Sequence, residues 1–131
     1  MIQLTDEAEI LFRQIHPNHM RAGVPLSDRF RPSPKDEGKL SVDRSSLVTA
    51  AESFDRFISN GFASAAVYGV TVGECFAENL PSFEDPIAES ETLKANAAHA
   101  IIDFQGFPEK NWKNIARRLH LKAVARGQQH P

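Results

Sequence analysis

Apolar residues form short runs along this chain, separated by stretches rich in proline and charge. Residues 9–15 predict a first strand, which Pro17 stops. Lys39–Asp43 alternates apolar and polar positions with a period of two, which indicates a short, half-buried strand. Residues 64–72 are rich in small and β-branched side chains and carry no charge, so we expect a central strand there. Residues 99–104 predict a further buried strand.

Two helices are predicted from their start and stop signals. Thr49 followed three residues later by Glu52 matches a capping box, in which each side chain binds the other residue's backbone N–H. The apolar stripe of this helix is Phe54, Phe57 and Ile58, and Asn60–Gly61 should end it. A second helix is expected from Pro108 to Gly127. Its apolar face is formed by Trp112, Ile115, Ala116, Leu119, Ala123 and Val124.

The remaining segments are expected to be irregular. Residues 17–37 predict a long loop, and residues 81–95 predict a polar, acidic one. The tail of residues 127–131 is expected to be frayed. With no internal repeat and 131 residues, the chain predicts one domain spanning residues 1–131. Its expected fold class is α+β, with a small sheet of about four strands and two principal helices.

Composition narrows the class of protein only slightly. Hydrophobic residues make up 41% of the chain and charged residues 24%, as in ordinary globular proteins. Cys75 is the single cysteine, so an internal disulfide is excluded, and a reducing compartment is favoured. No apolar run approaches the roughly 20 residues that cross a bilayer, and the acidic start of the chain is unlike a signal peptide. We therefore expect a cytoplasmic protein with no membrane partner.

Charge is distributed unevenly along the chain, although the net charge is only -2. Residues 45–104 carry nine acidic and two basic side chains, whereas residues 105–131 carry six basic side chains and one acidic. The basic helix 109–126 could contact RNA, and the acidic middle could contact a basic protein partner. The two regions could equally pair with each other, or be solvated.

The polar residues that suit binding or chemistry are concentrated in the first third. Arg13 sits on the first strand and His16 just after it, which would place a guanidinium and an imidazole at one rim of the sheet. Arg31 and Lys35, with Arg29, surround a proline-stiffened loop that could hold an anion. A simple alternative is that these side chains form ordinary ion pairs, turn caps and solvated loop charges.

Further candidates lie at the second strand and beyond it. Ser41 could be a nucleophile or a hydroxyl contact to a ligand, and Arg44 a further ligand-binding cation, although an outward-facing strand serine is an equally simple reading. His99 and Asp103 are four residues apart on a predicted strand, which favours a buried, hydrogen-bonded histidine. The motifs GxGxxG, GxxxxGK[ST], GxSxG, CxxC and HExxH are absent, so we predict no metal site and no site of those types.

The layout of residues 9–54 resembles RES-domain toxins, which are bacterial proteins with an ADP-ribosyltransferase-like fold that consume NAD. The similar features are the arginine on an early strand and the segment Thr49-Ala50-Ala51-Glu52. The resemblance implies NAD as cofactor or substrate, with Arg13 and Glu52 at its pocket. Leu40 stands where that family has an aromatic residue. The chain also resembles short uncharacterised bacterial proteins that share an Arg-Gln-x-His-Pro start.

Three hypotheses about function follow from these residues. In the first, the protein binds a phosphate-bearing ligand such as a nucleotide or NAD, and acts on it as a toxin-type enzyme. Arg13, Arg31, Lys35 and Arg44 would hold the ligand, while His16, Glu52 and Ser41 would be catalytic. In the second, it is a nucleic-acid-binding or ribonuclease-like protein. In the third, it is a non-enzymatic interaction module, such as an antitoxin, an immunity protein or a phage-defence component.

Overall fold

Five strands form the main sheet in the spatial order β5–β1–β4–β7–β6, and every neighbouring pair is antiparallel. The computed structural model describes all residues from 1 to 131. The strands are β1 (Ile10–Ile15), β4 (Lys39–Arg44), β5 (Ala66–Thr71), β6 (Ser82–Glu84) and β7 (His99–Asp103). The helices are α1 (Ala50–Ser59), α2 (Val72–Ala77) and α3 (Trp112–Arg126). The fold is therefore α+β, as predicted, with a fifth strand and a third, short helix.

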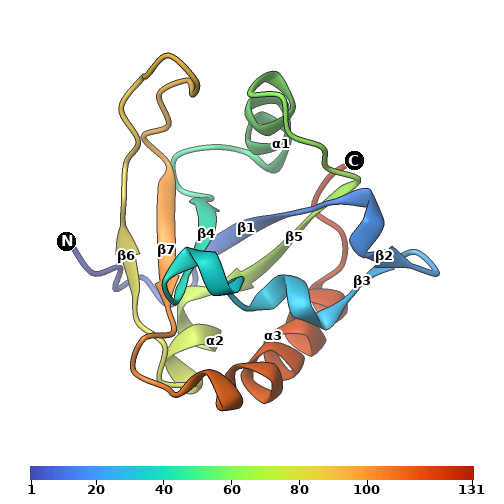
Figure 1. The fold of residues 1–131 in the computed structure, drawn as a ribbon, viewed down its shortest axis with the longest axis vertical. Helices are drawn as coiled ribbons and strands as arrows, with labels where there is room; N and C mark the ends of the chain where they lie inside the picture. Colours follow the sequence, from blue (N-terminus) through green and yellow to red (C-terminus); the bar gives the residue numbers. More distant parts are fainter.

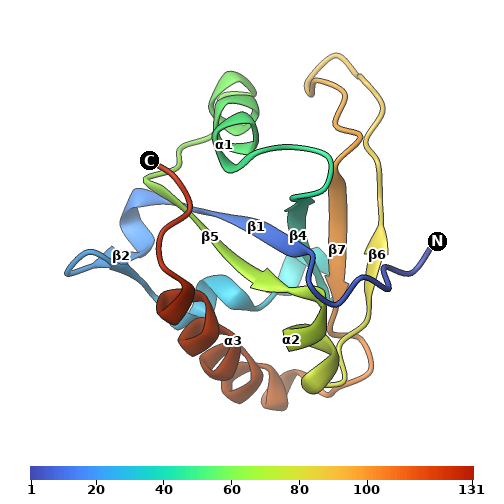
Figure 2. The ribbon, with the colours of Figure 1, turned by 180° about the vertical axis from the view of Figure 1, so that it is seen from behind.

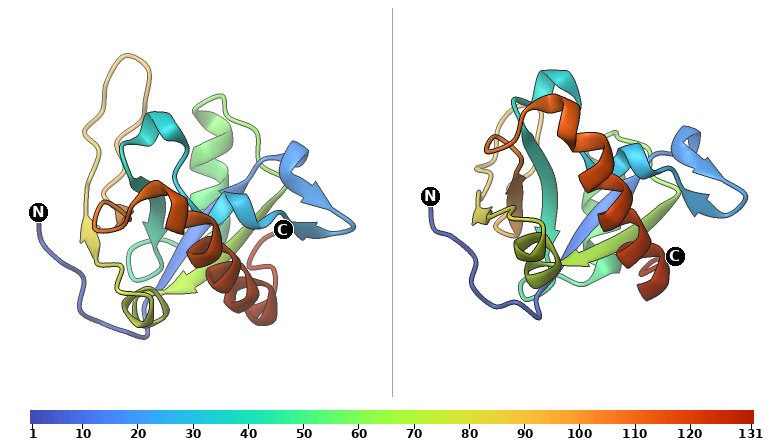
Figure 3. Two further views of the ribbon diagram at one scale, coloured as in Figure 1. Left: turned by 60° about the horizontal axis from the view of Figure 1, so that its bottom comes forward. Right: turned by 90° about the horizontal axis from the view of Figure 1, so that it is seen from below.

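The two long helices lie on opposite sides of this sheet (Figure 1 and, from behind, Figure 2). Figure 3 shows α3 running diagonally across the sheet. Its buried side chains are Ile115, Ala116, Leu119 and Ala123, all four on the face predicted from the sequence. They join Leu11 and Ile15 of β1 and Leu40 and Val42 of β4 in a single core cluster. The longest helix, α3, has 15 residues, and none of the helices combines the length and the hydropathy of a membrane span.

The first predicted helix has the ends that its sequence indicates. In α1 the Thr49 hydroxyl accepts a hydrogen bond from the Glu52 N–H at 3.1 Å, and the Glu52 carboxylate accepts one from the Thr49 N–H at 2.9 Å. The helix ends at Asn60, and Gly61 follows with a positive φ of 88°. Its packing differs from expectation, because Ser53 is its only buried residue. The apolar stripe of α1 therefore does not enter the core.

The segment expected to be a central strand lies at the edge of the sheet. β5 pairs with β1 along one side only, over all six of its residues. Its other side is covered by the C-terminal tail, which was expected to be frayed. The Val67 N–H donates to the carbonyl of His130, and the Gln129 N–H donates to the carbonyl of Val67. Because the tail shields this edge, β5 is as buried as a central strand and has the same apolar sequence.

Besides short elements in the 17–37 loop, two regular elements, β6 and α2, were not predicted from the sequence. β6 lies within the predicted acidic loop 81–95 and pairs with β7. α2 follows β5 directly, and Thr71 and Glu74 form its capping box. The same Thr-x-x-Glu spacing predicted α1 correctly, but here the β-rich run before it favoured a strand ending at residue 72.

The predicted long loop 17–37 contains only short elements. It holds a hairpin of β2 (Met20–Arg21) and β3 (Val24–Pro25) and three 3-10 turns, namely η1 (Pro17–His19), η2 (Ser27–Phe30) and η3 (Pro34–Asp36). A fourth turn, η4 (Glu109–Asn111), leads into α3. Phe30 of η2 is fully buried in the core and anchors the loop beside α3. This anchor brings Arg29 next to β1 and β4.

Candidate functional site

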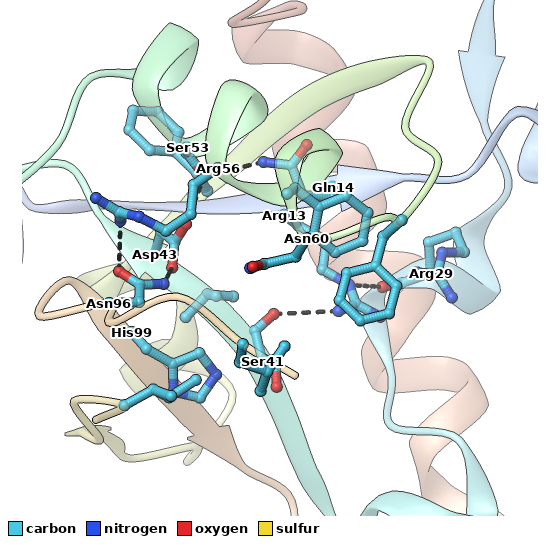
Figure 4. Close-up of a pocket in the computed structure, with 16 residues that line it drawn as sticks. Arg13, Gln14, Arg29, Ser41, Asp43, Ser53, Arg56, Asn60, Asn96 and His99 are labelled. Atoms are coloured by element: carbon cyan, nitrogen blue, oxygen red, sulfur yellow. Dashed lines mark hydrogen bonds between the residues drawn. The ribbon is translucent and has the colours of Figure 1, made fainter. Parts of the chain in front are cut away.

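A cavity of about 220 Å³ opens between the sheet, α1 and the loop of residues 85–98 (Figure 4). Its polar and charged lining residues are Arg13, Gln14, Arg29, Ser41, Asp43, Ser53, Arg56, Asn60, Asn96 and His99. Its apolar lining residues are Phe12, Val42, Phe57, Phe62, Ile87 and Leu93. Hereafter we call this cavity the α1 pocket. It combines cations with aromatic surface, and beside it α1 contacts the sheet through the polar Ser53.

Arg13 crosses a gap between two strands at the base of this pocket. β1 and β4 pair only at Leu11–Arg44 and Phe12–Asp43, and beyond these pairs they diverge. The Ser41 carbonyl points away from β7 and has no backbone partner in β1, so it accepts a hydrogen bond from Arg13 Nη1 at 3.1 Å. Arg13 Nε donates to the carbonyl of Arg29 at 2.9 Å. The side chain therefore joins β1, β4 and η2.

Neither Arg13 nor Arg29 has a carboxylate within ion-pair distance. The five ion pairs of the protein involve other side chains. Burial and the nearby Arg29 lower the pKa of Arg13 to about 9, although Asp36 acts in the opposite direction. Burial also lowers the pKa of Arg29, although Asp28 and Asp36 act in the opposite direction, and its Nε is buried without a hydrogen-bond partner. Burial is thus the main cause of both shifts, and the nearby carboxylates act on the two arginines without forming an ion pair with either.

Asp43 is the acidic residue that lines the pocket, and its carboxylate binds uncharged side chains. It accepts hydrogen bonds from Ser53 Oγ at 2.6 Å and from Asn96 Nδ2 at 2.8 Å. Ser53 in turn accepts from Gln14, and Asn96 accepts from Arg56 at 2.6 Å. This polar network ties α1 and the loop 85–98 to the sheet (Figure 4). It leaves Asp43 without an arginine as a direct partner.

His99 lines the pocket from the start of β7. Its Nδ1 lies 2.8 Å from the carbonyl oxygen of Asp85 and 3.3 Å from the Asp85 carboxylate. It is thus a largely buried, hydrogen-bonded histidine, as its strand position predicted. An N–H at Nδ1 leaves Nε2 as the acceptor, which is the form that can take up a proton. Its position in the pocket was not predicted.

The structure brings only two of the seven predicted site residues to the pocket, Arg13 and Ser41. His16 caps η1, where its Nδ1 accepts a hydrogen bond from the Asn18 N–H. Glu52 caps α1 and is exposed. Lys35 is exposed on η3.

The other two predicted ligand-binding cations also lie elsewhere. Arg31 lines a different hollow with Arg21 and Lys113. Arg44 is paired with the buried Glu9 at 3.2 Å and lies 3.9 Å from Glu84. The predicted first-third cluster is therefore spread over several places.

Residues that were not predicted to be site residues complete the pocket. Arg56, Phe57 and Phe62 come from α1 and its exit, and Asn96 comes from the 85–98 loop. Phe57 was predicted to lie on the apolar stripe of this helix, and its position at the pocket was not predicted. The polar Ser53 beside this stripe was the available signal that the helix faces polar side chains of the sheet rather than an apolar core.

Two ion pairs connect the basic C-terminal helix with the acidic middle of the chain. Arg118 pairs with Glu78 at 2.7 Å, and Arg126 pairs with Glu74 at 2.8 Å. The other four basic residues of the helix region, Lys110, Lys113, Arg117 and Lys122, form no ion pair. None of the six lies at the α1 pocket. RNA binding and protein binding through these regions stay predictions.

Groups that could hold a cofactor at the pocket are cations and aromatic rings rather than metal ligands. No three His, Cys, Asp or Glu side chains lie close enough together to bind a metal ion. Comparison of the chain with protein-family models, curated proteins and solved structures finds no match.

Proposed function

We propose that the protein binds a small phosphate-bearing ligand, of nucleotide or NAD-like chemistry, in the α1 pocket. The observation that carries this proposal is the pair of arginines, Arg13 and Arg29, that line one cavity without a carboxylate partner. Buried charges in proteins are normally paired, because leaving water is costly for an ion. A bound anion would supply the missing partner.

The free hydrogen-bond donors at the pocket suit a phosphate group. A guanidinium has five N–H donors, and Arg13 uses one at Nε and one at Nη1 for the two carbonyls. Three donors of Arg13 are thus left, and the side chain of Arg29 makes no hydrogen bond. Two guanidinium groups can bind several oxygens of one phosphate through charge-assisted hydrogen bonds. A single carboxylate has fewer acceptor oxygens and less charge.

The resemblance to RES-domain toxins would add a reaction that consumes NAD. The position of Arg13 among the lining residues of the pocket supports such a role. Glu52 does not support it, because its carboxylate caps α1 and is not among the lining residues. A reaction on the bound ligand would instead draw on His99, whose ring is held by Asp85, and on the exposed hydroxyl of Ser41.

Calorimetric titration with inorganic phosphate, AMP and NAD tests the proposal. We expect at least one of these to bind, and Arg29→Met to weaken that binding at least tenfold. Arg31→Met is the matched control, since Arg31 lies two residues away on the same loop but outside the α1 pocket. Equal losses in both variants would indicate nonspecific attraction to the loop. No binding by any of the three compounds would contradict the proposal.

A further inference from the structure

The α1 pocket has a wall of exposed aromatic surface beside its cations. Phe57 and Phe62 form a tilted ring pair with centroids 5.1 Å apart, and Phe62 is 49% exposed. Ile87 and Leu93 line the same cavity from the 85–98 loop. A ring left this exposed at the mouth of a cavity loses contact energy that a flat ligand could restore. The wall is therefore suited to stack against an aromatic ring.

The two sides of this wall are held at a defined separation. The Lys94 N–H donates to Asn60 Oδ1 at 3.0 Å, and Arg56 donates to Asn96. These bonds link α1 to the 85–98 loop at two places. The amide N–H₂ group of Asn60 has no protein partner. Asn60 lines the pocket, and in the sequence it lies between Phe57 and Phe62. A ring that stacks on the phenylalanines could present an acceptor atom to that amide.

The size of the cavity limits what can bind. Its volume of about 220 Å³ is below the range of about 300–1,000 Å³ usual for pockets that enclose drug-sized ligands. A single ring with a short phosphate-bearing arm fits such a space better than two linked nucleotides. The cavity thus favours the smaller of the two ligand types, mononucleotide over dinucleotide.

We infer that the ligand is an aromatic phosphate monoester of mononucleotide size, with its ring on Phe57 and Phe62 and its phosphate on Arg13 and Arg29. This inference rests on the proposed function and adds the ring and the size limit to it. Stacking of a base on an aromatic side chain commonly changes affinity by about tenfold or more. The ring contact should therefore be measurable separately from the phosphate contact.

The test compares ligands that differ by one part. Inorganic phosphate, ribose 5-phosphate, phenyl phosphate, AMP, UMP, adenosine and NAD are titrated calorimetrically into the wild-type protein. The same set is titrated into Phe62→Ala, which should fold because the ring is half exposed. Phe54→Ala is the matched control, since Phe54 lies on α1 but packs against His130 and does not line the pocket. Thermal unfolding of each variant checks that it is folded.

We expect the nucleoside monophosphates to bind at least tenfold more tightly than ribose 5-phosphate. Phe62→Ala should remove most of this advantage and leave the affinity for inorganic phosphate unchanged, whereas Phe54→Ala should preserve it. If phenyl phosphate binds as tightly as AMP, the ligand is an aryl phosphate in general. If AMP or UMP binds more tightly than phenyl phosphate, the ligand is a nucleotide.

Ribose 5-phosphate binding as tightly as AMP would overturn the inference and leave the proposed function standing. NAD binding more tightly than AMP would overturn the size limit. Adenosine binding as tightly as AMP, with no binding of inorganic phosphate, would instead overturn the proposed function.

Discussion

Replacing Arg29 by methionine should leave the protein at least as stable as the wild type, although a partly buried residue is changed. The Arg29 side chain makes no hydrogen bond or ion pair, and its Nε is buried without a partner. A buried unsatisfied polar group costs about 1–3 kcal/mol, and methionine removes that group while it fills a similar space. Burial is the main cause of the lowered pKa of Arg13, and the substitution removes the second cause, the positive charge of Arg29.

The expected change in the free energy of unfolding lies between zero and a gain of about 2 kcal/mol. It is smaller than the full cost of a buried unsatisfied group because Arg29 is only partly buried. Ligand binding should change in the opposite direction. Loss of hydrogen bonds to a charged group costs about 1.5–3 kcal/mol, which corresponds to a phosphate affinity about 10- to 150-fold weaker. A substitution that improves stability while it impairs binding is typical of a functional site.

Urea unfolding in phosphate-free buffer measures the first quantity, and calorimetric titration measures the second. Arg31→Met serves as the control for both, because its side chain lies outside the α1 pocket. A fall of more than about 1 kcal/mol in the unfolding free energy of Arg29→Met would show that Arg29 is structural, since removal of an unpaired group cannot cost that much. Unchanged phosphate affinity would refute its role in binding.

Three other substitutions test the roles assigned above. Arg13→Ala should lower the unfolding free energy by about 1–3 kcal/mol in urea titrations, because the carbonyls of Ser41 and Arg29 lose their donor; an unchanged value would mean that the gap between β1 and β4 closes without it. Glu52→Gln should leave phosphate affinity unchanged in calorimetry, since the carboxylate caps α1 away from the pocket; a tenfold loss would revive the role that the toxin resemblance implies. Glu9→Gln should cost about 3 kcal/mol at pH 7, as expected for one partner of a buried ion pair. Burial by itself raises the pKa of Glu9, but hydrogen bonds from its neighbours outweigh it and hold the pKa below 4.5. The stabilisation is therefore present above about pH 4.5 and lost as the pH falls through the lowered pKa, so stability measured from pH 7 to pH 3 should fall less in this variant than in the wild type; parallel curves would contradict this.

Local patterns predicted most of the regular structure. The capping box at Thr49, the alternation in β4 and the apolar face of α3 each depend on residues close together in sequence, and the structure confirms all three. β5 was placed wrongly at the centre of the sheet, because the pattern of a buried strand does not say what covers it. The residues that cover its edge, Gln129 and His130, are about 60 positions away in the chain.

The candidate site was predicted less well than the fold. Arg13 and Ser41 reach the pocket, whereas Arg44 binds Glu9 and Glu52 caps its own helix. A sequence shows which side chains can bind an anion, but it does not show which of them already have a partner. Arg44 and Arg13 are the same residue type, and only the distances to their neighbours distinguish them.

By itself, the sequence determined the longer elements of this protein and the apolar face of α3, because helix caps, strand alternation and turn residues act through neighbouring backbone groups. Only the tertiary structure decided where the pocket lies. The divergence of β1 from β4, the polar contact of α1 through Ser53 and the docking of Arg29 beside Arg13 each join segments distant in the chain. Burial and the lack of a carboxylate at ion-pair distance distinguish these cations, and both are properties of the packed molecule.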